Sequence, residues 1–311
     1  MAELPELTCP NCGGPIAAME YVGQVSAATG FDDCLRRCKS CKKIAASNAA
    51  DSKTVTFIYR DPLGNIPIES REGASEALAN ALNVRNRESK RHRFGFSTSE
   101  DAVTWVVFTY LLRSGQLLAA LRRARLISDE TSTPAPTLLL WGAPIGNGYR
   151  GAEIRKQLSE LCASLKENPS SFSEPDVIVD LGETGLIFIE VKYLSRNDKR
   201  PRNYSGWSRY ESASGLGWRF DDVRASGCYE LARNWCLLKN LAGKRVASLV
   251  NLGPKRLFLG ADGERLDSFV EALGVDEQSH FMKATWSDLL GNNLGDLPKW
   301  LAQFCQSRDL V

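Results

Sequence analysis

Two short apolar runs joined by a glycine-flanked turn constrain this chain more than any other feature. Residues 176–180 and 185–192 are rich in Val and Ile, and Gly182 and Gly185 flank the turn between them. This pattern predicts a buried β-hairpin. Side chains alternate along a strand, so Glu190 and Lys192 share one face at the end of the second run. Burying a carboxylate and an ammonium costs on the order of several kcal/mol unless they are paired or bind a metal.

Asp176 opens the first strand of this hairpin, and its position relative to Glu190 depends on the pairing register. A slip of one residue would send Asp176 to the opposite face of the sheet. We predict that Asp176 and Glu190 lie on one face, within reach of a single ion. Two such carboxylates suit Mg²⁺, and Lys192 beside them could orient a water or stabilise charge at phosphorus. The alternative is a purely structural Glu190–Lys192 pair.

The order Pro175-Asp176, turn, Glu190-Val-Lys192 resembles the PD-(D/E)xK superfamily of restriction-endonuclease-like nucleases. The acid opens one strand, and E-x-K closes the next. The resemblance covers roughly residues 96–290. It implies an α/β fold with an αβββαβ core. In that family Asp176 and Glu190 would hold Mg²⁺, and Lys192 would assist the attacking water.

Members of this family often carry an acid on the first core helix that reaches the metal. Glu100 is the best match here and Asp101 the second. The alternative is that both acids only complement the dipole of a helix N-terminus. On the helix that follows the motif, the family often has a polar residue that supports the site, and Glu230 and Arg233 are the candidates.

The resemblance therefore implies a Mg²⁺-dependent DNA endonuclease that hydrolyses phosphodiester bonds in double-stranded DNA. By analogy with small stand-alone family members, a restriction or host-defence enzyme is favoured. Two alternatives stay open: a repair or recombination nuclease, and a non-cleaving DNA-binding or scaffold module. A homodimer and a partner subunit of a defence system are also left open.

Composition agrees with this interpretation. A length of 311 residues with 43% hydrophobic residues indicates one large domain plus a small one. The formal net charge is only +2, so any DNA affinity must come from local patches. The chain has two histidines and no P-loop motif, which disfavours chemistry based on several histidines or on ATP. No apolar run approaches the roughly 18 residues of a membrane span, and no signal peptide is evident, so we expect a cytoplasmic protein without a membrane partner.

Nine cysteines include two C-x-x-C pairs, Cys9/Cys12 and Cys38/Cys41. Four thiolates from two such pairs complete the tetrahedral site that Zn²⁺ prefers, so the sequence predicts a structural zinc ribbon. An iron–sulfur cluster is the weaker alternative. The ribbon could act as a staple, contact protein, or contact DNA through neighbouring basic residues: Arg36, Arg37, Lys39, Lys42 and Lys43.

We assign residues 1–60 to the zinc ribbon, 61–95 to a basic linker with a helix, and 96–311 to the nuclease domain. Within the linker, the basic run 85–93 is interpreted as a solvated connector, with phosphate contact as the alternative. The other expected elements are strands at 53–59, 137–141, 245–252 and 281–286, and helices at 72–83, 153–165 and 227–240. A further helix is expected to start near residue 97, with a capping box from Ser97 to Glu100.

A long segment between residues 193 and 220 leaves directly from the catalytic strand. Basic residues interleaved with aromatic ones suit phosphate neutralisation and base or sugar contact. We predict DNA binding here, the alternative being a mobile surface loop. The candidate contacts are Arg196, Lys199, Arg200, Arg202, Tyr204, Trp207 and Arg209.

Overall fold

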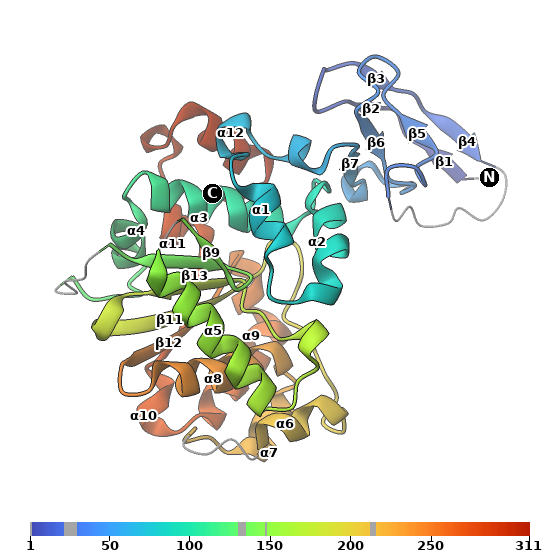
Figure 1. The fold of residues 1–311 in the computed structure, drawn as a ribbon. Coiled ribbons are helices and arrows are strands. Elements are labelled where there is room, and N and C mark those ends of the chain that lie inside the picture. The colour runs from blue at the N-terminus through green and yellow to red at the C-terminus, as the bar shows by residue number, and fades with distance from the viewer. Residues whose placement is uncertain (1, 22–29, 130–134, 147, 212–215) are drawn as a thin grey trace.

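A six-stranded mixed sheet lies at the centre of the larger part of the molecule (Figure 1). The computed structural model describes residues 2–21, 30–129, 135–146, 148–211 and 216–311. The strand order is β13-β12-β11-β10-β8-β9, with β10 antiparallel to both of its neighbours and β11, β12 and β13 mutually parallel. The strands are β8 (Thr137–Leu140), β9 (Ala143–Ile145), β10 (Val177–Asp180), β11 (Gly185–Val191), β12 (Val246–Gly253) and β13 (Phe281–Thr285).

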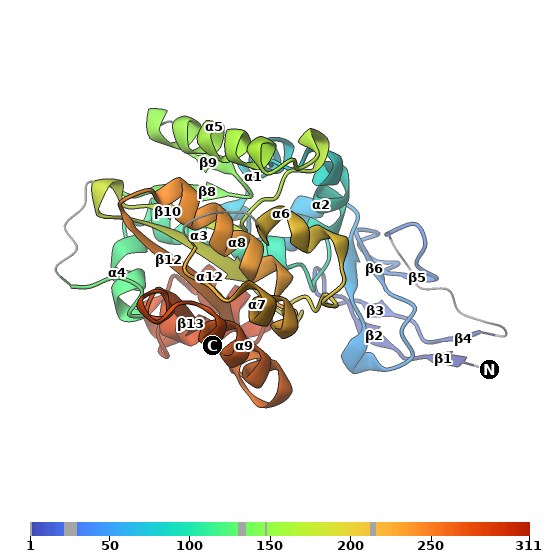
Figure 2. The same cartoon turned by 90° about the horizontal axis from the view of Figure 1, so that it is seen from below.

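Helices cover both faces of this sheet, as Figure 2 shows. Val179 and Ile189 belong to the cluster on one face, whereas Ile178 and Phe188 belong to the cluster on the other. This alternation explains why both hairpin strands are apolar throughout. The first face carries α3 (Glu100–Arg113), α4 (Leu117–Arg123), α11 (Trp286–Leu290) and α12 (Lys299–Ser307), and the second carries α5 (Tyr149–Ser164), α8 (Tyr229–Ala242) and α9 (Gly260–Ala272). Shorter helices on the second side are α6 (Ser208–Glu211), α7 (Phe220–Ser226) and α10 (Val275–Gln278).

Several predicted boundaries differ from the observed ones. The expected strand 137–141 ends at Leu140, because Trp141 has a left-handed φ of 52° and turns the chain into β9. The cap of α3 is Ser99 and not Ser97, since the Ser99 hydroxyl accepts a hydrogen bond from the Ala102 amide at 3.2 Å. Ser97 instead accepts one from the Phe57 amide. The helix expected over 72–83 is shorter, α1 (Ala74–Ala79).

A small N-terminal unit, residues 2–21 and 30–60, projects from this body (Figure 1). It consists of short antiparallel pairs and a three-stranded sheet. Its strands are β1 (Ala2–Leu4), β2 (Leu7–Thr8), β3 (Pro15–Ile16), β4 (Met19–Tyr21), β5 (Arg36–Arg37), β6 (Ile44–Ala46) and β7 (Phe57–Tyr59). The last strand connects the unit to the body, because the Tyr59 amide donates to Gly95 and the Ser97 amide donates to Phe57.

The basic run predicted as a solvated connector is instead a helix, α2 (Arg87–Phe94), packed on the body. Phe94 is fully buried in the same cluster as α3, and Lys90 is buried as well. The predominantly basic run of residues did not indicate that Lys90 faces inward. No helix in the described part of the chain is long and apolar enough to cross a membrane.

Candidate active site and cysteine cluster

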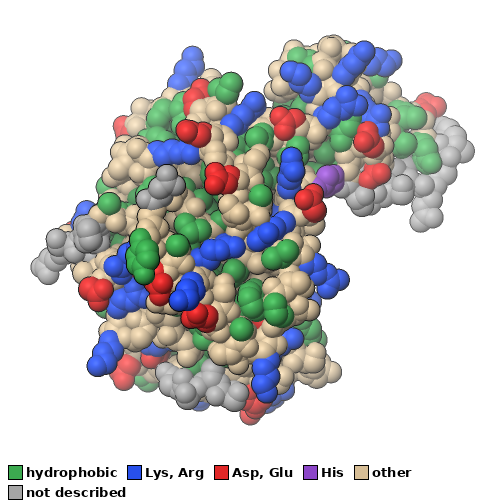
Figure 3. Space-filling model, viewed as in Figure 1, with side chains coloured by type: hydrophobic (Ala, Val, Ile, Leu, Met, Phe, Trp, Pro, Cys, Tyr) green, Lys and Arg blue, Asp and Glu red, His purple; other side chains and the backbone are tan. Residues whose placement is uncertain are grey.

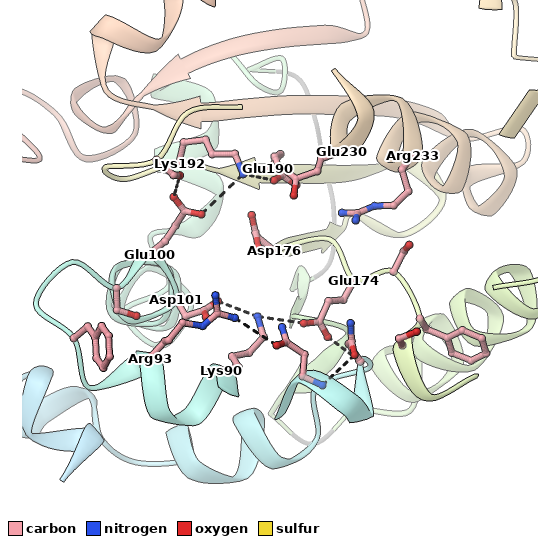
Figure 4. A pocket seen from close by; sticks show the side chains of 18 of the residues that line it. Lys90, Arg93, Glu100, Asp101, Glu174, Asp176, Glu190, Lys192, Glu230 and Arg233 are labelled. Carbon is pink, nitrogen blue, oxygen red and sulfur yellow. Dashed lines mark hydrogen bonds and ion pairs between the residues drawn. The ribbon is translucent and has the colours of Figure 1, made fainter. Parts of the chain in front are cut away.

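A pocket of about 430 Å³ lies where β10 begins and β11 ends. Its walls come from α2, the start of α3, residues 171–174, the hairpin and the start of α8 (Figure 4). We call it the carboxylate pocket. Its charged lining residues are Lys90, Arg93, Glu100, Asp101, Glu174, Asp176, Glu190, Lys192, Glu230 and Arg233.

The hairpin register brings Asp176 and Glu190 together. Val177 pairs with Ile189, so the next position outward sets Asp176 opposite Glu190. Both side chains line the carboxylate pocket. One carboxylate oxygen of Asp176 accepts a hydrogen bond from the Val191 amide at 2.8 Å, which fixes its orientation. The register and the shared pocket place the two carboxylates on one face, as predicted, and their reach to a single ion stays a prediction.

The ammonium of Lys192 lies among the acids of this pocket (Figure 4). Its Nζ is 2.5 Å from Glu190, 3.2 Å from Glu230 and 4.0 Å from Glu100. Glu190 and Lys192 are 3% and 5% exposed, so this is a buried pair. The pairing offsets the cost of burying either charge alone.

Glu100 reaches the site from the first turn of α3. One of its carboxylate oxygens accepts hydrogen bonds from the Tyr193 amide at 2.7 Å and from the Ser195 hydroxyl at 2.6 Å. Asp101 turns away to Lys90 at 3.0 Å. Of the two acids considered from the sequence, Glu100 is therefore the one that lies beside Lys192.

Burial and neighbouring charge shift the titration of these groups. The pKa of Asp176 is raised to about 7. Burial is the largest cause, Lys192 acts against it, and Glu100 acts in the same direction as burial. Burial likewise raises the pKa of Glu190. Burial alone would lower the pKa of Lys192, but the surrounding carboxylates, Glu190 first, hold it well above its ordinary value. Perturbed groups of both signs in one cavity are typical of functional sites.

Sequence reasoning missed several residues of this site, among them Asn234 and Glu174. Asn234 is fully buried, and its side-chain amide donates to Glu190 at 2.8 Å. Glu174 accepts a hydrogen bond from the Asn83 amide at 2.8 Å and pairs with Lys90. Asn234 lies one helical turn after Glu230, so an amide on that face of a helix was the available signal. The expected helix residues Glu230 and Arg233 both line the pocket.

The predicted DNA-binding segment is folded against α8 more closely than expected. Trp207 is 1% exposed, and its indole N–H donates to the Pro201 carbonyl at 3.0 Å. Its ring packs edge-on against Tyr229 with centroids 5.1 Å apart. The assignment of Trp207 to a DNA-contacting surface was therefore wrong, because this side chain belongs to the core.

The basic residues of the same segment lie at the surface, and several already have acidic partners. Arg196 pairs with Asp262 at 3.4 Å, Arg200 with Asp198 at 2.7 Å and Arg202 with Asp221 at 3.1 Å. Arg200 also lies over the ring of Tyr204, 5.1 Å from its centroid. Lys199 and Arg209 are exposed. The three paired arginines, Arg196, Arg200 and Arg202, would have to share or exchange these partners to bind phosphates.

The four predicted cysteines form a cluster in the N-terminal unit. Sγ of Cys9 is 3.7 Å from that of Cys41, and Sγ of Cys12 is 3.5 Å from that of Cys38. All four ligand atoms lie within 4.8 Å of one another, so the cluster could hold a metal such as zinc. Residues with positive φ follow each pair, Gly13 at 70° and Lys42 at 56°, and turn the chain back around the sulfurs.

The basic residues near this cluster are not equivalent. Arg36 is only 4% exposed, and its guanidinium donates to the carbonyls of Pro5 and Ser47, so it is not available for DNA. The other four are exposed: Arg37, Lys39, Lys42 and Lys43. Figure 3 shows Lys and Arg side chains gathered over this unit.

The two sites differ in how far their ligands have converged. Within the described residues, only the four cysteines bring three or more potential ligand atoms within 4.8 Å of one another. In the carboxylate pocket three acids surround the ammonium of Lys192: Glu100, Glu190 and Glu230. Comparisons with protein-family models, with curated proteins and with solved structures found no match to this chain.

Proposed function

We propose that the carboxylate pocket is the active site of a Mg²⁺-dependent DNA endonuclease. The observation that carries the proposal is the convergence of Asp176, Glu190 and Lys192 on one cavity with Glu100 of α3. Three of these residues come from the β10–β11 hairpin and Glu100 comes from α3, and all four have the chemistry expected for phosphodiester hydrolysis. When α4, β9, α5, α6 and α7 are set aside, the remaining order α3, β8, β10, β11, α8, β12 follows the αβββαβ order that the resemblance implies, which further supports the proposal.

The donor set fits a hard divalent cation. Mg²⁺ prefers carboxylate oxygens and keeps several waters, which suits an open pocket lined by acids. Asp176 and Glu190 would hold the ion, with Glu100 as the third acid. When bound, the ion would stabilise negative charge on the phosphate and make a water more acidic.

The remaining residues have roles that follow from their contacts. Lys192 can donate hydrogen bonds to a water or to a phosphate oxygen, and its position is set by Glu190 and Glu230. Asn234 orients Glu190 through its second carboxylate oxygen. Such support of a ligand by a hydrogen-bonded neighbour commonly tunes metal sites.

Double-stranded DNA is the proposed substrate. Surface charges that could receive its phosphates lie on the segment between β11 and α7: Arg196, Lys199, Arg200, Arg202 and Arg209. The exposed basic side chains of the N-terminal unit are a second candidate set. That unit is proposed to hold one structural Zn²⁺ on Cys9, Cys12, Cys38 and Cys41.

The test is cleavage of supercoiled plasmid by the zinc-loaded protein with Mg²⁺ and with EDTA. We expect cutting only with Mg²⁺. Discrete bands would indicate restriction, and preference for branched DNA would indicate repair. Binding without cleavage would reject the nuclease proposal in favour of a DNA-binding module.

Single substitutions decide whether this pocket is responsible. Asp176→Ala, Glu190→Ala and Lys192→Ala should each nearly abolish cleavage, because the groups act as a unit and their effects do not add. Glu160→Ala on the exposed face of α5 is the control and should cut normally. DNA affinity should be largely retained in Lys192→Ala. A Lys192→Ala protein that cuts at the normal rate would contradict the mechanism.

A further inference from the structure

Lys90 is a buried lysine that the proposed chemistry does not use. It lies on α2, only 6% exposed, and its ammonium faces the side of the carboxylate pocket opposite Lys192 (Figure 4). Nζ is 3.0 Å from Asp101 and 3.2 Å from Glu174. It also lies 4.9 Å from the ring centroid of Trp141, within the range of a cation–π contact.

Each partner of Lys90 is linked to a proposed metal ligand, either along the chain or by a backbone hydrogen bond. Asp101 is the neighbour of Glu100 on α3. Glu174 precedes Asp176 by two residues, with the rigid Pro175 between them. The Trp141 amide donates to the backbone carbonyl of Asp176 at 3.1 Å. One ammonium therefore connects the helix that carries Glu100 with the strand that carries Asp176.

A buried ion pair of this kind resists rearrangement. Removing one partner leaves an uncompensated charge in a low-dielectric environment, which is strongly unfavourable. The arrangement is reinforced because the Asn83 amide also donates to Glu174, at 2.8 Å. Lys90 and Asn83 both belong to the segment between the N-terminal unit and α3.

We propose that Lys90 is a positioning residue that sets the separation of Glu100 and Asp176 through its contacts with Asp101, Glu174 and Trp141. The segment predicted as a linker thereby becomes part of the active site. This inference rests on the proposed function, because it assumes that Glu100 and Asp176 bind one ion.

The direction in which cation affinity changes when Lys90 is replaced separates a positioning role from a purely electrostatic one. Lys90 is a positive charge near a cation site, so its loss alone would reduce repulsion and tighten cation binding. Loss of positioning has the opposite effect, because substitution of a neighbour that orients ligands typically weakens metal affinity about 10- to 100-fold. We therefore expect Lys90→Met to bind Mn²⁺ at least about tenfold more weakly than the wild type.

The experiment is calorimetric titration of the full, zinc-loaded chain with Mn²⁺, with thermal melts to verify folding. Lys156→Met, in an exposed pair with Glu160, is the matched control and should bind as the wild type does. Lys90→Arg keeps a cation between the acids and should retain most of the affinity. If Lys90→Met does not fold, the double variant Lys90→Met, Glu174→Gln leaves the net charge unchanged and should show the same loss.

The outcomes distinguish this inference from the function on which it rests. A folded Lys90→Met or double variant with unchanged or tighter Mn²⁺ binding would overturn the positioning role and leave the nuclease proposal standing. The metal site would be overturned, and the role of Lys90 with it, if the wild type does not bind Mn²⁺ or if Asp176→Asn leaves that binding unchanged. Cleavage as a function of Mg²⁺ concentration should shift in parallel with Mn²⁺ affinity.

Discussion

Asp176 is held in a fixed conformation, which would suit a metal ligand. Its backbone carbonyl accepts from Trp141 and its side chain accepts from Val191, so it has little freedom to turn away from the pocket. Burial raises its pKa from an ordinary value of 3.8 to about 7. In the absence of metal, the folded protein therefore holds the Asp176 proton more tightly than the unfolded chain does.

This shift predicts how metal-free stability depends on pH. The folded pKa lies above the unfolded one, so the stabilising contribution of neutral Asp176 is fully present below about pH 4 and is lost as the pH rises through about 7. Asp176→Asn keeps the side chain neutral at all pH values. In EDTA, its melting temperature relative to the wild type should rise between pH 5 and pH 8.5.

Asp276→Asn on the exposed end of α10 is the control for that measurement and should follow the wild type at every pH. A constant difference between Asp176→Asn and the wild type across this range would contradict the raised pKa.

The residues of the site were predictable to different degrees. Asp176, Glu190 and Lys192 lie on one hairpin, and strand alternation with a tight turn is enough to bring them together. Glu100 was anticipated only through the family resemblance. Asn234 and Lys90 depend on how α8 and α2 pack against the sheet. Their contacts bridge distant parts of the chain, for which a single sequence carries no signal.

At the scale of elements, the segment between β11 and α8 combines two kinds of residue with different roles. Trp207 and Tyr210 are buried, whereas Arg196, Arg200, Arg202 and Arg209 lie at the surface. Tyr210 is buried and donates to Glu167 at 2.9 Å, while Glu167 accepts from the Ser173 amide at 2.6 Å. This chain of contacts connects α6 with the wall of the carboxylate pocket.

Trp207 provides the test at this scale. Trp207→Ala would leave a cavity beside Tyr229, and we expect a loss of about 3–5 kcal/mol in the free energy of unfolding. Arg209→Ala, on the exposed side of the adjoining helix, should change it by less than about 0.5 kcal/mol. Urea denaturation of both variants measures the difference. A Trp207→Ala protein with unchanged stability but lost DNA affinity would restore the original interpretation of this residue.

Trp207 was misinterpreted for a physical reason, whereas DNA contact by the basic residues stays a prediction. Aromatic residues between charges can stack on bases or fill a core, and composition does not distinguish the two. The acids that partner Arg196 and Arg202 lie on α9 and α7, far along the chain. The hydrophobic strands, in contrast, were recognisable because both of their faces are buried and their length is typical of a sheet.

At the scale of the whole molecule, the N-terminal unit has its own small core around the cysteines, separate from the two large clusters of the body. A unit of this size cannot bury enough apolar surface to be stable without help. A metal bound by the four thiols would supply that stability, whereas the body has extensive cores on both faces of its sheet.

Metal analysis of the purified protein should therefore give one zinc ion per chain, lost when Cys9 and Cys12 are both replaced by Ser. In that variant the N-terminal unit should be unfolded from the outset, and the body should unfold near its usual temperature. Cys34→Ser, which changes a neighbouring thiol outside the cluster, should retain zinc. Native protein without zinc would remove the ribbon assignment, and a large drop in the unfolding temperature of the body would show that the body depends on the metal.

The ammonium of Lys192 has a practical consequence for watching the proposed reaction in time. Lys192 supplies a counter-ion to Glu190 and Glu230 without any metal. If the proposed function holds, DNA could therefore be bound before Mg²⁺ is added. Rapid mixing of a preformed protein–DNA complex with Mg²⁺ would then start every molecule together. The delay before the first cut would include the time that Lys192 needs to separate from Glu190 and Glu230 as the ion binds.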